Sequence, residues 1–434
     1  MILAPTLTLS AGSGAAIARP TFSRDFAGEK TLNNGTGPAI TFTRASNATF
    51  FDASGVLQTA SNNEPRFDHD PATGASRGLL IEEARTNSIR NSQAGGSTNG
   101  VIGSGGVMPT NWGISSVLTA TGLSREVIGT GTSNGFAYID VKISGTNTSG
   151  SAVNIGFGFE SGLQIAALSG QTWTSSAYVA LVGGSFSGAA SLAVSVVERN
   201  SGGIFLNQSV VSILSATSTL TRFAVTRTLS EATTAFVNPA IVGSVNNGST
   251  VDFTLRIAAP QLEQGAFPTS YIPTTTAEAT RSADSAVVAP ISGFYNQSEG
   301  TLFAEGSARG GSLPSLASLD DNTANERIQL RRNISVSQAQ FLVSDGGTAV
   351  VNVNTGSWTS DTAAQKLILA YKADDCAASF NGASVVADTS ASMPQATQFL
   401  IGNGANSNLI NGHLRKIAYW PKRLSNALLE QLTT

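Results

Sequence analysis

Asn-Gly and Asp-Gly pairs recur along this chain and constrain its fold more than any other feature of the sequence. The Asn-Gly pairs begin at Asn34, Asn99, Asn134, Asn247, Asn381, Asn403 and Asn411, and an Asp-Gly pair begins at Asp345. Both dipeptides favour the positive φ angles of two-residue turns, which join antiparallel strands. The sequence therefore predicts a chain built mainly of β-hairpins.

Between the turns, apolar and polar residues alternate with the period of a strand that has one buried and one solvated face. The clearest case is residues 251–257, in which Val251, Phe253, Leu255 and Ile257 alternate with Asp252, Thr254 and Arg256. Residues 192–197 and 222–226 show the same period, with Ala193, Ser195 and Val197 on the expected solvated side of the first. The only clear helical pattern lies at residues 425–432, where Ser425 can act as N-cap. We therefore expect an all-β fold.

The composition excludes several classes of protein. Charged residues make up only 12% of the chain and the net charge is −3, so no basic surface is available for a nucleic-acid backbone. The single cysteine, Cys376, cannot form an intrachain disulfide, which fits assembly in a reducing cytoplasm. No stretch approaches the roughly 20 apolar residues of a membrane span. The N-terminal residues 1–20 lack the basic start of a secretion signal, so we expect any exit from a cell to follow lysis.

The chain divides by pattern into modules arranged in series. We expect a β-rich N-terminal module at residues 1–95, a β-sandwich at 100–272, a polar linker at 273–285 and a second β-sandwich at 286–434. The linker is predicted from the Thr- and Ala-rich sequence TTTAEATRSAD.

Three sets of segments carry a family resemblance. In the first module, TFTRASNATFFDASGVLQTA, PRFDHDP and GLLIEEARTN resemble the N-terminal region of many phage and prophage structural proteins. In the second, GQTWTSSAYVALVGGSFSG and TLRIAAPQLEQGAFPTSYIPT resemble the phage head spike fibre domain, a jelly roll similar to carbohydrate-binding modules. In the third, KLILAYKADDCAASFNG and LINGHLRKIAYWPKRLSNALLEQLT resemble a laminin-G-like or concanavalin-A-like lectin jelly roll.

The resemblance implies a non-enzymatic component of a phage particle, on its head or tail. It implies that the N-terminal module binds other virion proteins, that the jelly rolls bind host-surface glycans, and that the chain is a homo-oligomer, most simply a trimer. Two alternatives remain open. One is an architectural decoration or minor tail protein that binds no glycan, and the other is a polysaccharide depolymerase.

Large aromatic side chains are the first candidates for glycan contacts, because the C–H faces of sugars stack on apolar rings. Trp358 is the strongest candidate, since its small polar neighbours in GSWTS predict an exposed loop, and Trp173 and Tyr178 are further candidates. The alternative for each is packing in the core.

Two acidic clusters could supply oxygen ligands to Ca²⁺, the only cofactor that the sequence suggests. They are Asp320, Asp321 and Asn322 in the third module, and Asp68 and Asp70 in the first. Turns capped by Asp or Asn side chains are the favoured explanation of both clusters.

No catalytic residues are expected. Glu82 and Glu83 are adjacent, so on a strand they point to opposite faces and cannot flank a sugar bond; we expect one to pair with Arg85 or Arg44. No nucleophile elbow of the G-x-S-x-G type, which requires a turn from a strand into a helix, is expected, and no histidine lies near Cys376 in the sequence.

Overall fold

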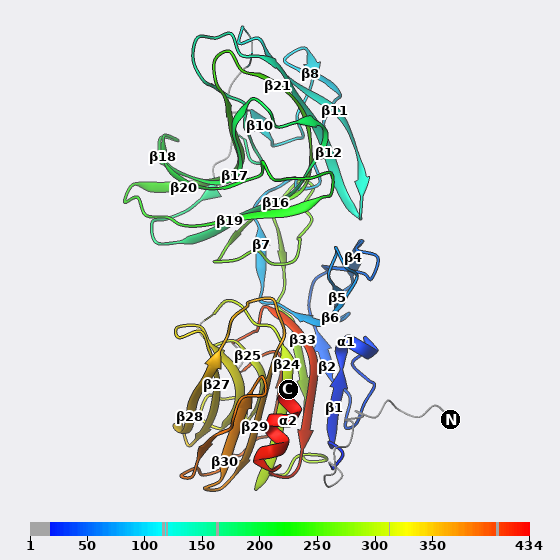
Figure 1. Cartoon of the computed structure of the whole chain (residues 1–434), viewed down its shortest axis with the longest axis vertical. Helices are drawn as coiled ribbons and strands as arrows, with labels where there is room; N and C mark the ends of the chain where they lie inside the picture. The colour runs from blue at the N-terminus through cyan, green and yellow to red at the C-terminus, as the bar shows by residue number, and fades with distance from the viewer. Residues whose placement is uncertain (1–17, 115–117, 119, 162–164, 312, 405–407) are drawn as a thin grey trace, which may run out of the picture. The chain divides into compact units, whose positions relative to one another are not determined.

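The computed structural model describes residues 18–114, 118, 120–161, 165–311, 313–404 and 408–434. The predicted all-β fold is confirmed, because nearly every regular element is a strand in an antiparallel sheet (Figure 1). Residues 1–17, which include most of the segment assessed above as a secretion signal, lie outside the described residues.

The chain forms two compact units, and the sequence of one is inserted in the sequence of the other. Unit 1 combines the described residues up to Glu83 with Ser282–Thr434, and unit 2 is Ala84–Arg281. This differs from the three modules in series that the sequence predicts, because strands from both ends of the chain share the sheets of unit 1.

Unit 1 is a sandwich of two large sheets. Sheet A has the order β31-β30-β29-β24-β33-β6-β5, and β1 also pairs with β33. Its strands are β31 (Val386–Asp388), β30 (Cys376–Phe380), β29 (Gln365–Lys372), β24 (Glu299–Gly306), β33 (Gly412–Trp420), β6 (Ser76–Ile81), β5 (Phe67–His69) and β1 (Phe22–Asp25). Strand β33 therefore joins the beginning of the chain to its end.

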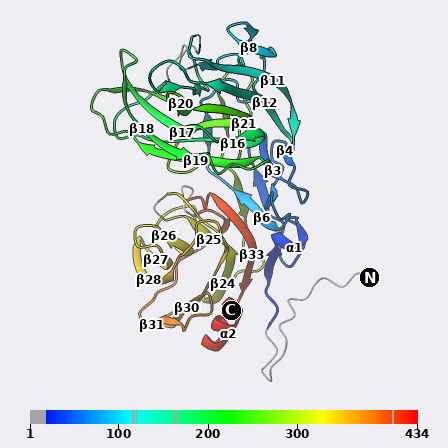
Figure 2. The ribbon, with the colours of Figure 1, turned by 45° about the horizontal axis from the view of Figure 1, so that its top comes forward.

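Sheet B of unit 1 has the order β2-β23-β32-β25-β26-β27-β28. Its strands are β2 (Thr41–Thr43), β23 (Ser285–Val288), β32 (Gln398–Ile401), β25 (Ser315–Asp320), β26 (Arg327–Asn333), β27 (Gln338–Asp345) and β28 (Thr348–Ser357). Figure 2 shows β26–β28 on one side of this unit and β24 and β33 on the other. The hairpin β3 (Ala48–Phe51) and β4 (Leu57–Ala60) completes the strands of the unit.

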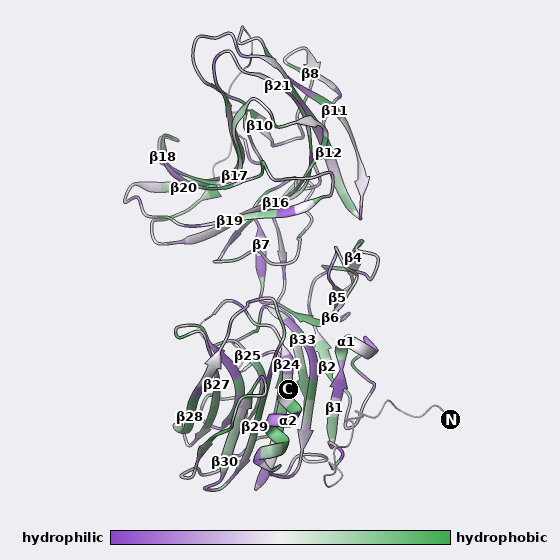
Figure 3. Cartoon of the chain, in the orientation of Figure 1, coloured by the Kyte–Doolittle hydropathy of each residue, from purple (hydrophilic) through white to green (hydrophobic). Residues whose placement is uncertain are grey.

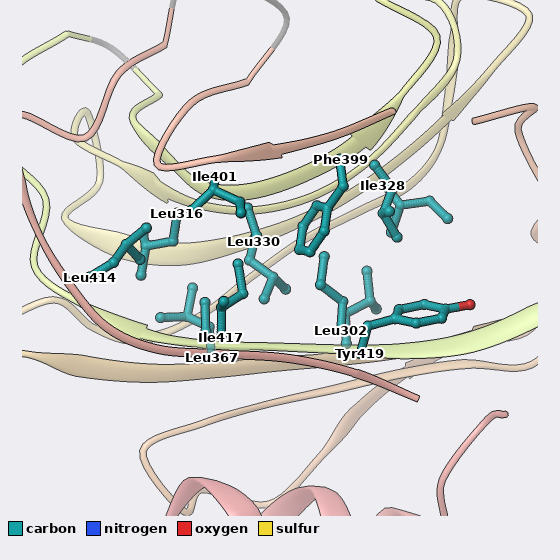
Figure 4. Packing of buried hydrophobic residues seen from close by; sticks show 14 of the residues in the cluster. Leu302, Leu316, Ile328, Leu330, Leu367, Phe399, Ile401, Leu414, Ile417 and Tyr419 are labelled. Atoms are coloured by element: carbon teal, nitrogen blue, oxygen red, sulfur yellow. The ribbon is translucent and has the colours of Figure 1, made fainter. Parts of the chain in front are cut away.

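The core of unit 1 lies between the two sheets. Leu302, Leu367 and Ile417 of sheet A face Leu316, Leu330 and Phe399 of sheet B, and all are fully buried (Figure 4). Two short helices add to this sandwich, α1 (Phe26–Glu29) and α2 (Asn426–Thr433). The predicted C-terminal helix is thus confirmed, and its Leu429 and Leu432 form a second cluster with Phe303, Ile368 and Trp420 of sheet A.

Unit 2 is also a sandwich of two sheets. Sheet C has the order β19-β16-β21-β12-β11-β8-β9, with β19 (Thr221–Thr228), β16 (Thr172–Ser185), β21 (Thr250–Gln264), β12 (Phe136–Thr146), β11 (Leu123–Ser133), β8 (Gly100–Ile102) and β9 (Gly105–Gly106). Sheet D has the order β10-β14-β20-β17-β18, and β13 and β15 also pair with β20. Its strands are β10 (Gly113–Ile114), β14 (Phe157–Gly158), β20 (Thr234–Val245), β17 (Ala189–Asn200), β18 (Phe205–Ser212), β13 (Val153–Asn154) and β15 (Ile165–Ala166).

The alternation predicted at residues 251–257 is confirmed in β21, whose Val251, Phe253, Leu255 and Ile257 are buried in the core of unit 2. Hydrophobic and hydrophilic residues are interleaved along the strands of both units (Figure 3). Strand β17 is different. Its Ala193, Ser195 and Val197, expected to face water, are also buried, so both faces of this strand are covered.

The segment predicted as a linker is instead ordered structure. It contains β22 (Ala279–Arg281), which pairs with β7 (Arg85–Asn87), and the first residue of β23. The prediction of a solvated connection here is wrong, because Arg281 and Asp284 are buried.

Candidate functional site

The three aromatic residues predicted to contact a glycan are buried. Trp173 is 6% exposed and belongs to the core of unit 2, where its indole Nε1 donates to Gln171 Oε1 at 3.2 Å. Tyr178 is 9% exposed, and its ring centroid lies 4.3 Å from that of Phe136. Neither ring offers an open face for stacking against a sugar.

The expected exposure of Trp358 is wrong. Its side chain is 3% exposed and stacks on Phe380 in the core of unit 1, with 5.9 Å between ring centroids. The backbone N–H of Trp358 donates to the carbonyl of Ser337, which holds the residue against the neighbouring turn. Gly356 has φ 62°, and a Cβ there would lie 2.2 Å from the Phe380 ring, so the small neighbours serve close packing.

The candidate Ca²⁺ ligands of the third module are occupied by hydrogen bonds within the protein. Asp320 is fully buried, and its carboxylate accepts from the Ser318 hydroxyl at 2.6 Å, the backbone N–H of Asn322 at 3.0 Å and the Gln398 amide at 2.7 Å. Asp321 caps its own turn by accepting from the backbone and hydroxyl of Thr323. This is the arrangement of the alternative, a turn capped by Asp side chains.

The candidate Ca²⁺ ligands of the first module, Asp68 and Asp70, also form hydrogen bonds within the protein. Asp68 accepts from the backbone N–H of Phe51 at 2.7 Å and contacts His413 Nε2 at 2.8 Å. Asp70 accepts from the backbone of Ala72 and Thr73, and a hydrogen bond from Arg77, together with these backbone bonds, lowers its pKa to about 2. The two carboxylates therefore serve different local structures.

Within the described parts of the chain, no three or more His, Cys, Asp or Glu side chains are grouped so that they could hold a metal ion. In the same residues, no helix has the length and apolar character needed to cross a bilayer.

Residues of the N-terminal segments TFTRASNATFFDASGVLQTA, PRFDHDP and GLLIEEARTN meet Asp284 in one buried ionic cluster. Arg66 donates to Glu82 at 2.8 Å and to Asp284 at 2.6 Å, and Arg44 donates to Asp284 at 3.1 Å. All four side chains are at least 94% buried. The sequence prediction named Arg85 or Arg44 as the partner of one glutamate, whereas the pair in this cluster joins Glu82 to Arg66, which was not named. Glu83 bonds to Asn411. These contacts assign the segments a role in holding unit 1 together.

Buried polar side chains also hold the closing segment of unit 2, PQLEQGAFPTSYIPT, in its structure. Glu263 is fully buried and accepts from the backbone N–H and the hydroxyl of Thr269. Gln261 accepts from the backbone N–H of Ile272 at 2.7 Å. These two side chains fix the return of the chain after β21.

The candidate binding site is a partly exposed cluster on the face of sheet C that points away from the core. Asp140 of β12 and Arg256 of β21 are register partners, and the guanidinium donates two hydrogen bonds of 2.9 Å to the carboxylate. The guanidinium also lies over the ring of Tyr138, 3.6 Å from its centroid. We call these three residues the Tyr138 cluster.

Small residues surround the Tyr138 cluster on its face. In the register of sheet C, Arg256 is opposite Ala180 on one side and Asp140 is opposite Gly129 on the other. A Cβ added at Gly129 would meet nothing within 4 Å, so open space lies beside the carboxylate. A Cβ at Gly131 would lie 2.7 Å from the Tyr138 hydroxyl, so glycine there makes room for the ring.

The ion pair between Asp140 and Arg256 orients the Tyr138 cluster. The hydrogen bonds that Arg256 donates to Asp140 raise the pKa of the guanidinium above its ordinary value against the opposing effect of burial. The arginine side chain is 24% exposed and the aspartate 14%, so both reach solvent. The planar ion pair can exchange hydrogen bonds with vicinal hydroxyls. The guanidinium covers one face of the Tyr138 ring, so the apolar contact available to a ligand comes from the part of the ring that the guanidinium leaves uncovered.

The sequence analysis did not predict the Tyr138 cluster, although the alternation that places its residues on a solvated face was visible in the sequence. The alternation in residues 251–257 places Arg256 on the solvated face, and the same rule applied to β12 would have placed Tyr138 and Asp140 on such a face. The register that brings them together joins residues 116 positions apart, and no local pattern carries it.

The fold and the Tyr138 cluster together define an all-β protein with two antiparallel β-sandwiches, in which the sequence of one sandwich is inserted in that of the other. The inserted sandwich has an aromatic and ionic cluster on its outer face. No family model matches the chain, and no curated protein matches it.

Among solved structures, the chain has a distant likeness to a tripod from the baseplate of bacteriophage Tuc2009, with 12% identity over 84% of this chain and 99% of that one, and a TM-score of 0.29. A tandem CBM22 domain from Paenibacillus barcinonensis gives 8% identity over 75% and 98% of the two chains, at a TM-score of 0.21. A Trypanosoma rangeli sialidase gives 15% identity at a TM-score of 0.28, and the match spans 34% of this chain and about a quarter (26%) of the sialidase. Values this low assign none of these proteins' functions to this chain.

Proposed function

We propose that this chain is a non-enzymatic structural protein of a phage particle that displays a glycan-binding β-sandwich. The resemblance of its segments to phage structural proteins, to the head spike fibre domain and to lectin jelly rolls supports the proposal. Within it, residues 1–95 contribute the attachment to other virion proteins, and unit 2 contacts saccharides on the host surface.

The Tyr138 cluster is the single observation that carries the glycan-binding part of the proposal. Sugar-binding sites combine an apolar ring with rigid polar groups, because a sugar offers C–H faces and hydroxyls at fixed spacing. The two hydrogen bonds between Asp140 and Arg256 fix both groups before any ligand arrives, which reduces the entropy lost on binding. Many copies on one particle would raise the avidity of a weak single contact.

A glycan array probed with the full chain tests this proposal, followed by titration of the saccharides that bind. We expect Tyr138→Ala to weaken binding by about tenfold, the effect of losing about 1.4 kcal/mol of stacking and orientation. Tyr138→Phe keeps the ring and serves as the matched control, with affinity near that of the wild type. Incubation of the same saccharides should release no new reducing ends.

Two results would overturn the proposal. If no saccharide binds the full chain on the array or on host cell-wall polysaccharide, the architectural alternative is favoured. If reducing ends accumulate in proportion to protein concentration, the depolymerase alternative replaces it.

A second feature supports the homo-oligomeric part of the proposal. Strand β18 lies at the edge of sheet D, and residues 200–221 contain no charged side chain. Five large apolar residues there are at least 36% exposed, namely Ile204, Phe205, Val210, Val211 and Leu214. Monomers usually protect edge strands with charges, so an unprotected edge favours contact with another copy.

The oligomer part has its own test. Light scattering coupled to size-exclusion chromatography should give a multiple of the mass of one chain, with a trimer expected from the fibre resemblance. Val210→Lys should shift the mass toward that of one chain, whereas Thr219→Lys, also in the uncharged stretch but outside β18, should not. A wild-type monomer at all concentrations would contradict this part.

A further inference from the structure

A second polar face lies on unit 1, on the side of sheet B that points away from the core, and its central side chains are buried while Gln398 and Asn352 at its two ends reach solvent. A continuous chain of side-chain hydrogen bonds crosses this face from β32 to β28. Its members are Gln398, Asp320, Ser318, Gln329, Arg331, Gln340 and Asn352, joined by bonds of 2.6–3.2 Å. We call this surface the Arg331 face.

Arg331 is the member of this face that lacks a counter-charge. It is 5% exposed, its Nε donates to Gln340 Oε1 at 2.6 Å and its Nη1 donates to Gln329 Oε1 at 3.1 Å. Both acceptors are neutral amides. No ion pair joins Arg331 to any carboxylate in the described residues, and every Asp and Glu of the chain is among them. The adjacent Arg332, by contrast, pairs with Asp361 at 2.6 Å.

The Arg331 face has more positive than negative groups, which favours the binding of an anion. Burial and the neighbouring charge of Arg327 lower the pKa of Arg331 to about 10, so the guanidinium remains charged at neutral pH. The face carries two arginines, Arg327 and Arg331, and one carboxylate, Asp320, which already accepts three hydrogen bonds. A buried cation that has only neutral partners gains strongly from a desolvated anion.

The Arg331 guanidinium also has one nitrogen that can donate a hydrogen bond to a ligand. Among the described residues, Arg331 Nη2 has no hydrogen-bond acceptor, because the bonds of this side chain come from Nε and Nη1. At the β28 side of the network, Asn352 is exposed, and its Oδ1 accepts from Gln340, which leaves its Nδ2 free to donate. Asn354, two residues further on the same strand, is exposed as well.

We propose that the Arg331 face binds a saccharide that bears a carboxylate, of the uronic acid class. The carboxylate accepts from Arg331 Nη2, and the sugar hydroxyls accept from the exposed amides of Asn352 and Asn354. The Gln329 and Gln340 side chains hold the guanidinium in place, so they are positioning residues. This site lies in unit 1 and is independent of the Tyr138 cluster in unit 2.

Calorimetric titration of the full chain with trigalacturonate, at low ionic strength, tests the proposal. Galactotriose, which lacks carboxylates, is the matched neutral probe. We expect trigalacturonate to bind at least about tenfold more tightly, the typical advantage of a charge-assisted hydrogen bond over a neutral one. Affinity should fall as salt is added, because the contact is ionic.

Two variants locate the site. Arg331→Lys keeps the charge and loses the planar fork, and Asn352→Ala alters only an exposed side chain, so a loss of trigalacturonate binding in both cannot come from misfolding alone. Arg77→Gln changes a partly exposed arginine of the same unit that pairs with Asp70, so it is the control and should bind like the wild type. Equal affinity for the two probes, or unchanged binding in both variants, would overturn the proposal.

The test also separates this site from the proposed function. Tyr138→Ala should leave trigalacturonate binding unchanged while it weakens the saccharides found on the array. If trigalacturonate binding is lost in Tyr138→Ala and kept in Arg331→Lys, the acidic saccharide belongs to unit 2 and the Arg331 face is not its site.

Discussion

Arg66 donates a 2.6 Å hydrogen bond to Asp284, although 218 positions separate the two residues in the sequence. Asp284 Oδ2 also accepts from the backbone N–H of Glu82, and the Asp284 N–H donates to the Glu82 carbonyl. One aspartate therefore ties the strand that leaves unit 1 to the strand that returns to it.

Replacing Asp284 should destabilise unit 1 severely. Asp284→Asn removes the negative charge shared by Arg44 and Arg66 and leaves both guanidinium groups fully buried with less compensation. We expect a loss of about 3–5 kcal/mol in the free energy of unfolding, the usual cost of breaking a buried ion pair from one side. Urea denaturation followed by circular dichroism measures it.

Asp375→Asn is the comparison for that variant. Asp375 also pairs with an arginine, Arg423, at 2.9 Å, but its side chain is 54% exposed. Surface pairs contribute about 0–1 kcal/mol, so this change should be close to neutral. Equal effects of the two substitutions would show that the buried cluster does not stabilise the unit.

Unit 2 should lose stability in acid through Glu198. Burial alone would raise the pKa of this carboxyl, but hydrogen bonds from Thr234, the Glu231 backbone and Arg227, with the charge of Arg227, outweigh burial and lower it. A carboxyl with a lowered pKa stabilises the fold above its ordinary value of about 4.3 and loses that contribution as the pH falls through the folded-state pKa. We expect the free energy of unfolding to fall across this range.

The Glu198→Gln variant should show a flatter dependence of unfolding free energy on pH below about pH 4.3. Glu278→Gln, at an exposed position of the same unit, should keep the wild-type slope. The assignment fails if the slope in Glu198→Gln matches that of the wild type.

The single thiol should be unreactive in the folded protein. Cys376 is 1% exposed, and burial raises its pKa to about 11, so almost no thiolate is present at neutral pH. We expect Ellman's reagent to react slowly with the native chain and to reach one equivalent after denaturation. A fast reaction under native conditions would contradict the burial of β30.

All four tryptophans should behave as core residues in fluorescence. Their exposure is 6% for Trp112 and Trp173, 3% for Trp358 and 2% for Trp420. We expect a short-wavelength emission maximum with weak acrylamide quenching, and no change on saccharide binding. Trp358→Ala should cost about 3–5 kcal/mol in unfolding free energy, the typical effect of emptying a large core site.

Local features of the fold could be predicted from the sequence because they depend on near neighbours. The Asn134-Gly135 and Asn381-Gly382 pairs adopt the positive φ angles expected, at the ends of β11 and β30. The helix after Ser425 follows from its Leu spacing, although the Ser425 side chain makes no capping hydrogen bond.

The domain arrangement and the site could not be predicted locally. Strand β33 pairs with β1 and β6, so Phe22 is opposite Tyr419 and Leu79 is opposite Leu414, across more than 300 positions. Trp358 shows that a local sequence pattern can also be misleading about burial. Its neighbours Gly356 and Ser357 are typical of a loop, yet Gly356 is small because the Phe380 ring lies against it.

The nested connectivity has a consequence for how the protein is made. Strand β33 lies inside sheet A between β24 and the N-terminal strands, yet it is synthesised after every other strand of the described residues. Unit 2 is complete once Arg281 has left the exit tunnel, so we expect the middle of the chain to fold during translation. At that stage β1 and β6 still lack their partner β33, and β2 lacks its partner β23. Polypeptides that terminate early should consequently contain a native unit 2 flanked by an aggregation-prone N-terminal region.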